Sequence, residues 1–247
     1  MEGIGDKPLN EITTDDIRQH LAGCAERVSK VTIDNKRRIY NSFFSWMEDE
    51  EHILKNPVKR IRKVRQEKKI PKPFSEEELE RLRDAATGER DRAIVELLTS
   101  TGMRIGEMEL LNINDVDFQA GEIVVFGKGA KERIVYLNAK ARVALTKYLD
   151  SRSDKNKALF VSKGRKNPSR LMGRGAAMAL KALEGKAGVE NVHPHRFRRT
   201  AATIAISRGM PIEQVREMLG HVNIETTTRY AIVSERNVKA SHAKYLN

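Results

Sequence analysis

Side chains that could hold an anion are concentrated in residues 193–200, which read HPHRFRRT. Two histidines and three arginines stand there, directly before the small apolar run AATIAI. Positions three apart share a helix face, so His195 and Arg198 can address one ligand together. Arg196 and Arg199 form a second pair, which we expect to turn toward solvent or a DNA backbone. A solvated charge cluster is the alternative for the whole segment.

A metal site is the other chemistry that this segment could support. His193 and His195 could bind zinc, but Cys24 is the only cysteine of the sequence. No further histidine or carboxylate stands at a familiar ligand spacing. We therefore expect no metal and no cofactor.

Four other segments carry reactive side chains, each with an ordinary alternative. Arg104 precedes Glu107 by one helical turn in TGMRIGE, where a surface ion pair is the simpler explanation. Lys128 stands between two glycines of a predicted hairpin turn, GKGAK, where an exposed lysine is common. His221 and, nine residues later, Tyr230 follow in MLGHVNIETTTRY, where a tyrosine is usually a packing residue.

The order of these segments is more informative than any one of them. The motifs TGMRIGE, GKGAKERIVYL, PHRFRRTAAT and MLGHVNIETTTRY, in this succession and spacing, resemble those of the tyrosine recombinase family, which includes phage integrases and Xer-like proteins. The resemblance covers essentially the whole chain and implies an enzyme, a site-specific DNA recombinase. The family often has histidine immediately after the second arginine, where this chain has Arg199; the difference concerns local packing more than the reacting groups.

The resemblance implies that Tyr230 is the nucleophile, which cleaves DNA through a 3′-phosphotyrosine and releases a 5′-hydroxyl. Such an exchange keeps the energy of the phosphodiester bond in a covalent intermediate. Negative charge builds on the non-bridging oxygens during attack, and planar guanidinium groups match their geometry. Arg104 and Arg198 are expected to supply this clamp.

The resemblance also implies the groups that handle protons and orientation. Lys128 would protonate the departing 5′-oxygen, and His195 would act as acid and base near the tyrosine proton. His221 would hydrogen-bond a non-bridging oxygen, and Glu107 would orient Arg104. No metal is required, because the two guanidinium groups replace the cationic clamp of metal-dependent nucleases.

The pattern of elements predicts a mainly α fold with a small antiparallel sheet, divided into two domains. Residues 1–55 are expected to form a small helical core-binding domain, of the SAM-like type in the family, and 56–73 a basic linker. Residues 74–247 are expected to form the mixed α/β catalytic domain with a C-terminal helical tail. Ser75 with Glu78 forms a capping box at its start, and EIVVF and RIVYL predict a hairpin, followed by a short strand ALFVS.

Two stretches carry further expectations. In residues 39–47, the apolar side chains at helical spacing are expected to be core. The linker holds eight basic residues and one acidic residue, which favours either a solvated segment or contact with the DNA backbone. The residues expected to contact the DNA backbone are Lys59, Arg60, Arg62, Lys63 and Arg65, together with Arg196 and Arg199.

The composition agrees with a nucleic-acid partner. The chain has 46 Lys and Arg against 34 Asp and Glu, a net charge of +12 and a pI near 9.8. Cationic side chains that bind a phosphate backbone release its counterions, which favours binding. Double-stranded DNA is therefore the expected partner. We see no secretory signal and no apolar run long enough for a membrane, and expect a cytoplasmic protein. From the family we expect a homo-oligomer, a tetramer on two DNA sites, with the tail docking between protomers.

Two alternatives stay open at this point. A type IB topoisomerase-like enzyme would use the same chemistry to relax DNA by swivelling around a covalent nick. A catalytically silent DNA-binding regulator would keep the scaffold without the reaction. The hairpin, the small helical unit and the tail favour the recombinase, and the presence of every expected reactive residue argues against the regulator.

Overall fold

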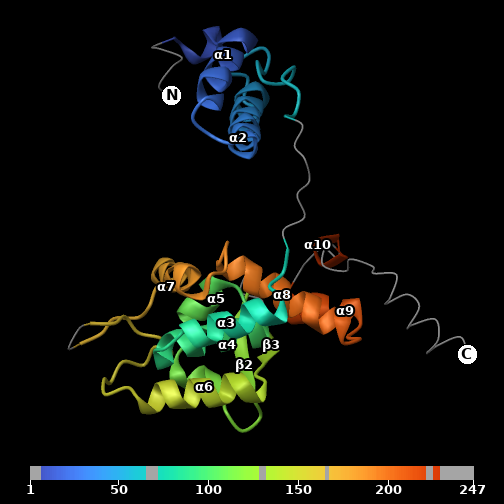
Figure 1. Ribbon diagram of the computed structural model, residues 1–247. Coiled ribbons are helices and arrows are strands. Elements are labelled where there is room, and N and C mark those ends of the chain that lie inside the picture. The colour runs from blue at the N-terminus through green and yellow to red at the C-terminus, as the bar shows by residue number, and fades with distance from the viewer. Residues whose placement is uncertain (1–6, 65–71, 128–131, 165–166, 221–224, 229–247) are drawn as a thin grey trace, which may run out of the picture. The chain divides into compact units, whose positions relative to one another are not determined.

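A computed structural model covers residues 1–247 and describes 7–64, 72–127, 132–164, 167–220 and 225–228. The chain divides into two compact units, Met1–Ile70 and Pro71–Asn247 (Figure 1). Each unit has its own cluster of buried hydrophobic side chains. Within the described ranges, no helix combines the length and apolar character needed to cross a membrane.

The first unit contains the 3-10 helix η1 (Leu9–Glu11) and the helices α1 (Thr14–Ala25) and α2 (Lys30–Asp49). α1 begins after Thr13, whose hydroxyl oxygen accepts a hydrogen bond from the Asp16 NH while the Asp16 carboxylate accepts one from the Thr13 NH. This reciprocal cap satisfies two backbone donors that a helix start leaves unpaired. The buried cluster between the helices and the segment after them is Ile12, Ile17, Leu21, Ile33, Phe44, Met47, Ile53 and Val58.

The apolar stripe predicted as core in α2 is only partly buried. Phe44 and Met47 are buried, but Ile39 is 65% exposed and Phe43 is 38% exposed. With 3.6 residues per turn, a line of i, i+4 positions drifts by about 40° at each step, so its far end leaves the buried face. The expectation that Ile39 and Phe43 are core residues is therefore wrong.

The first half of the predicted linker packs against the core of the first unit. Val58 is buried, and the Asn56 side chain donates to Ser45 Oγ at 2.9 Å and accepts from the Val58 NH at 2.8 Å. The partly buried Ile61 and Val64 pack against the same core. The basic side chains between these anchors are exposed: Lys59, Arg60, Arg62 and Lys63.

The second unit is mostly helical around a small sheet, which confirms the predicted fold class. Its elements are α3 (Glu76–Ala85), α4 (Glu89–Thr101), α5 (Ile105–Leu110), η2 (Ile113–Asp115), β1 (Val116–Asp117), β2 (Glu122–Phe126), β3 (Glu132–Tyr136), α6 (Ala139–Asp150), α7 (Gly173–Ala187), α8 (Pro194–Ser207), α9 (Ile212–Leu219) and α10 (Glu225–Thr228). α3 begins with the predicted capping box between Ser75 and Glu78.

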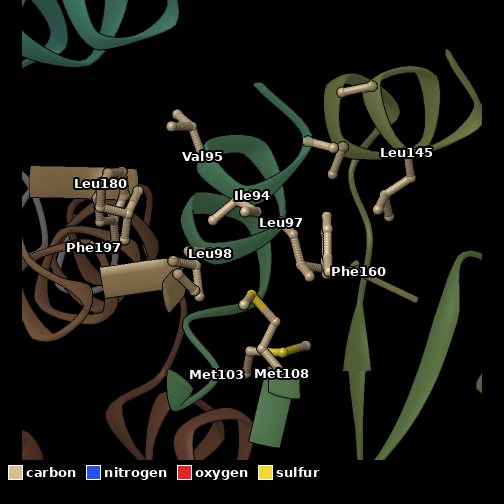
Figure 2. Close-up of a cluster of buried hydrophobic side chains, with 14 of the residues drawn as sticks. Ile94, Val95, Leu97, Leu98, Met103, Met108, Leu145, Phe160, Leu180 and Phe197 are labelled. Carbon is tan, nitrogen blue, oxygen red and sulfur yellow. The ribbon is translucent and has the colours of Figure 1, made fainter. Parts of the chain in front are cut away.

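Helix α4 lies at the centre of this unit, where it contacts α6, α7 and α8. Figure 2 shows the side chains that meet there: Ile94, Val95, Leu97 and Leu98 of α4, Met103, Met108 of α5, Leu145 of α6, Phe160, Leu180 of α7 and Phe197 of α8. The residues at the C-terminal end of α4, Thr101, Gly102 and Met103, are buried as well.

The sheet is antiparallel with the order β1-β2-β3. β2 and β3 form the predicted hairpin, with Val124 opposite Ile134. The predicted strand ALFVS is not formed among the described residues; Ala158 and Val161 instead make isolated bridges with Asn112 and Arg170. Too few consecutive pairs form there to build a ladder.

A glycine lets three elements meet at the end of α4. Gly102 caps α4 in the left-handed conformation, with φ of 60°. A Cβ at this position would lie 2.9 Å from Leu219 Cδ2 and 3.2 Å from Ala201 Cβ, and its carbonyl accepts a hydrogen bond from Arg198. Glycine therefore allows the ends of α4 and α9 to approach α8 closely without strain.

Candidate active site

Arg104 is held at the start of α5 by the carboxylate of Glu107, one turn later. Glu107 Oε2 accepts a hydrogen bond from the Arg104 backbone NH at 2.7 Å, and Oε1 accepts one from the guanidinium Nη1 at 3.0 Å. Glu107 is buried, whereas the Arg104 side chain is 38% exposed. One side of the guanidinium group is thus fixed while the group still reaches the surface.

Glu107 also binds a second guanidinium group, that of Arg133 on β3. Arg133 Nη1 and Nη2 donate to Glu107 Oε1 and Oε2 at 2.8 and 2.7 Å. Burial acts to raise the pKa of Glu107, but the hydrogen bonds from Arg133 and Arg104 outweigh it and hold that pKa below its ordinary value. The carboxylate is therefore ionised at neutral pH.

Arg133 was not among the residues predicted from the sequence. The available signal was strand alternation, because Arg133 stands two residues before Val135 and so on the same face of β3. Val135 is buried, and an inward arginine on that face needs a buried acceptor. No sequence pattern shows that Glu107 is that acceptor.

Helix α8 supplies the second predicted pair, His195 and Arg198, from its first turns. Arg198 is buried, and its Nη1 donates to the Gly102 carbonyl at 2.8 Å while Nη2 donates to the Leu219 carbonyl. Desolvation and then the nearby guanidinium groups, Arg198 first, lower the pKa of His195. Its ordinary value is about 6.5, so the imidazole is neutral at pH 7 and can accept a proton.

The C-terminal end of α9 joins the arginines into one cluster. Three consecutive carbonyls there each accept from a different arginine: Met218 from Arg133 Nε at 3.0 Å, Leu219 from Arg198, and Gly220 from Arg104 Nη2 at 3.3 Å. Carbonyls at a helix C-terminus lack partners within the helix and carry partial negative charge, so cations stabilise them. Arg104 and Arg198, far apart in the sequence, thus meet at one helix end.

A cavity of about 290 Å³ opens beside this cluster. Its lining includes Arg104, Glu107, His195 and Arg198, together with Phe126 and Gly127 at the end of β2. Two cationic side chains and a neutral imidazole in one hollow can bind an anion and exchange a proton with it. A larger cavity of about 490 Å³ beside α6 contains none of the predicted catalytic residues.

Three predicted catalytic residues, Lys128, His221 and Tyr230, lie outside the described residues, as does Arg65. The described chain ends close to each of the three in sequence. Gly127 precedes Lys128, Gly220 precedes His221, and α10 ends at Thr228, two residues before Tyr230.

The expectation that Arg196 turns to solvent is wrong. Arg196 is buried: its Nη2 pairs with Glu78 Oε2 at 2.7 Å, and its guanidinium carbon lies 4.0 Å from the centre of the Phe74 ring. Its other donors bind the carbonyls of residues 72, 73 and 190. Arg196 therefore fastens the start of the unit to α8, while the partly buried Arg199 donates to the Lys72 carbonyl at 3.3 Å.

The described part of the chain brings together no group of three or more His, Cys, Asp or Glu side chains that could hold a metal ion. The positive charges beside the cavity belong to arginines, which pair with the single carboxylate of Glu107.

Comparison with known proteins gives one consistent result. The family model described as the phage integrase family matches residues 54–236. "Tyrosine recombinase XerC" of Bacillus subtilis (strain 168) is 35% identical over 252 residues, which cover 95% of this chain and 82% of that protein.

Solved structures agree with this result. The crystal structure of XerA recombinase matches with a TM-score of 0.62 and 30% identity, over 98% of this chain and 86% of that one. The Tn1549 transposon integrase in complex with a circular intermediate DNA matches with a TM-score of 0.78 and 20% identity, over 96% and 87%. At that identity, the second match supports the fold alone.

Proposed function

Because the chain belongs to the phage integrase family and is a tyrosine-type site-specific DNA recombinase, we propose that it cuts and rejoins DNA through Tyr230. The Tyr230 oxygen attacks the scissile phosphorus, a 3′-phosphotyrosine bond forms, and the bond to the 5′-oxygen breaks. A 5′-hydroxyl from a second strand then attacks the phosphotyrosine and releases the tyrosine. The number of phosphoester bonds stays constant, so no cofactor is consumed.

The proposed phosphate clamp consists of Arg104 and Arg198. The observation that carries it is their meeting at the end of α9, beside a cavity that His195 also lines. Guanidinium groups prepositioned on the non-bridging oxygens stabilise the charge of the transition state, and removing one such donor typically costs about 3 kcal/mol of barrier. These arginines supply the positive charge that metal ions supply in other nucleases.

Three further residues complete the proposed mechanism. Lys128 protonates the departing 5′-oxygen. This role is supported by Phe126 and Gly127, which directly precede Lys128 in the sequence and line the cavity. His195 exchanges the tyrosine proton, which its neutral state at pH 7 supports. His221 hydrogen-bonds a non-bridging oxygen, which its place directly after Gly220 supports.

Double-stranded DNA is the substrate, and we assign its backbone contacts to exposed cations on both units. The first unit offers Lys59, Arg60, Arg62 and Lys63, whose exposure on a packed segment supports this role. Arg65 and Arg199 are proposed in the same role. We propose a tetramer on two DNA sites, with the tail after Tyr230 docking between protomers.

A strand-transfer assay tests this function against its two rivals. A duplex containing a site selected from random DNA by this chain would be nicked beside the cleavage point, so that the released 5′ end is lost and the adduct accumulates. We expect transfer of the bound strand to a second duplex, and no transfer by Tyr230→Phe. Relaxation of supercoiled DNA without strand transfer would support the topoisomerase alternative, and no adduct would support the silent regulator.

A further inference from the structure

Arg133 occupies a position that the proposed mechanism does not use. Its side chain is 11% exposed, and its hydrogen bonds reach Glu107 in α5 and the C-terminal end of α9. Nη1 and Nη2 donate hydrogen bonds to the two carboxylate oxygens of Glu107, and Nε donates to the Met218 carbonyl at 3.0 Å. One planar group thereby connects β3, α5 and the end of α9.

The charge balance of this cluster differs from that of a simple structural ion pair. Glu107 carries one negative charge but binds the two guanidinium groups of Arg104 and Arg133. These two ion pairs leave one excess positive charge in the set of three side chains. A local excess of positive charge beside the cavity favours the binding of an anion, such as the scissile phosphate.

The backbone around Arg133 is shaped to this contact. Gly220 has φ of 64° and lies directly against the guanidinium group. A Cβ at Gly220 would lie 3.1 Å from Arg133 Nε and 3.2 Å from Cζ. The carbonyl of Gly220 accepts from Arg104, so the same glycine touches both arginines.

We propose that Arg133 is a positioning residue for strand cleavage, which acts by fixing the Glu107 carboxylate and the end of α9 so that Arg104 meets the scissile phosphate. This inference rests on the proposed function. Lysine cannot replace it fully, because an ammonium group lacks the planar fork that reaches two carboxylate oxygens and a carbonyl together. The proposed role of Arg133 involves no direct contact with the phosphate.

The test compares R133K and R133Q with the unmodified chain on the selected DNA site. Single-turnover cleavage at saturating DNA is expected to fall about 10- to 100-fold in R133Q, the range typical when an outer partner of a site is removed. R133K is expected to fall between R133Q and the unmodified chain. The Kd of non-covalent DNA binding is expected to stay within about threefold, since Arg133 is not among the residues proposed to contact the DNA backbone.

A second substrate separates positioning from general structural loss. A methylphosphonate at the scissile position removes the phosphate charge that Arg104 neutralises. The defect of R133Q is therefore expected to shrink to less than about threefold on this neutral substrate. A defect of equal size on both substrates would overturn the inference.

R83Q is the matched control. Arg83 makes a similar buried, two-point contact with Glu96, at 2.9 and 3.1 Å, outside the cavity. R83Q is expected to lower the melting temperature without the difference between substrates.

Two other outcomes would also overturn the inference. One is wild-type cleavage by R133Q, and the other is loss of cooperative melting in both Arg133 variants while R83Q retains it. Failure of the unmodified chain to form a Tyr230-dependent adduct would instead overturn the proposed function.

Discussion

Arg198 and Arg104 donate to consecutive carbonyls, those of Leu219 and Gly220, although one lies in α8 and the other at the start of α5. The carbonyl end of α9 thus aligns two cations that the sequence separates widely. In the proposed reaction these two cations neutralise the negative charge of the scissile phosphate. This geometry supports the proposal that the two arginines act together as one phosphate clamp.

The clamp makes a direct prediction for Arg198. We expect Arg198→Lys to lower the rate of adduct formation by about 10²- to 10³-fold, because an ammonium group cannot reproduce the fork-shaped contact with the phosphate. The rate would be measured by single-turnover cleavage of the nicked site. Arg208→Lys, at the exposed end of the same helix, is the control and should cleave at the normal rate. Equal rates for the two variants would contradict the clamp.

Gly102 predicts an effect on stability. Gly102→Ala should reduce the free energy of unfolding by about 1–3 kcal/mol, because alanine is strained at positive φ and its Cβ would collide with Leu219. Denaturant unfolding would measure the change. Gly185→Ala, where a Cβ meets nothing within 4 Å in α7, should leave stability unchanged or slightly higher. A stable Gly102→Ala protein would show that the α4–α9 contact adapts easily.

His195 predicts a pH dependence. The pKa of His195 is lowered by desolvation and by neighbouring cations, including Arg199. The imidazole therefore stays mostly neutral as the pH falls to 6.5, its ordinary pKa. If His195 accepts the tyrosine proton, cleavage falls as the pH drops through that lowered pKa. Arg199→Ala removes one cation, raises the pKa of His195, and should shift this decline to higher pH.

The pH–rate profile of single-turnover cleavage would measure this shift. Arg208→Ala removes a cation that does not influence His195, and it should leave the profile unchanged. An unshifted profile in Arg199→Ala would show that the decline in rate at low pH does not arise from protonation of His195.

Arg196 and Arg60 should differ in what they stabilise. Arg196→Ala is expected to lower the free energy of unfolding by about 2–4 kcal/mol, because it breaks a buried ion pair and the stacking on Phe74. Arg60→Ala should leave stability unchanged but reduce the slope of log K against log salt by about one. Thermal melting and salt-dependent DNA binding would measure both. If Arg196→Ala instead reduced the salt slope without loss of stability, Arg196 would be a DNA contact rather than a structural residue.

The residues that sequence reasoning placed correctly share a local cause. Helix periodicity placed His195 and Arg198 on one side of α8, and the turn glycines with alternating strands predicted the β2–β3 hairpin. The family motifs identified Arg104 together with Glu107, which the structure joins by two hydrogen bonds. Each of these relationships spans few residues, so the sequence contains the information.

The errors concern contacts between distant segments. Periodicity paired Arg196 with Arg199 but did not show that Arg196 faces Phe74 and Glu78, which lie more than a hundred residues earlier. Arg133 was missed because its acceptors, Glu107 and Met218, come from two other elements. Only packing decides which face of an element is buried and what it meets there.

The central claim is that Tyr230 becomes bonded to DNA, and mapping the adduct tests it most directly. The nicked selected site would be incubated with the chain, digested, and the nucleotide-bearing peptide identified by mass spectrometry. We expect the nucleotide on Tyr230, its loss in Tyr230→Phe, and its persistence in Tyr136→Phe, which removes an exposed tyrosine of β3. A nucleotide on any other residue, or an adduct that survives Tyr230→Phe, would show that Tyr230 is not the nucleophile.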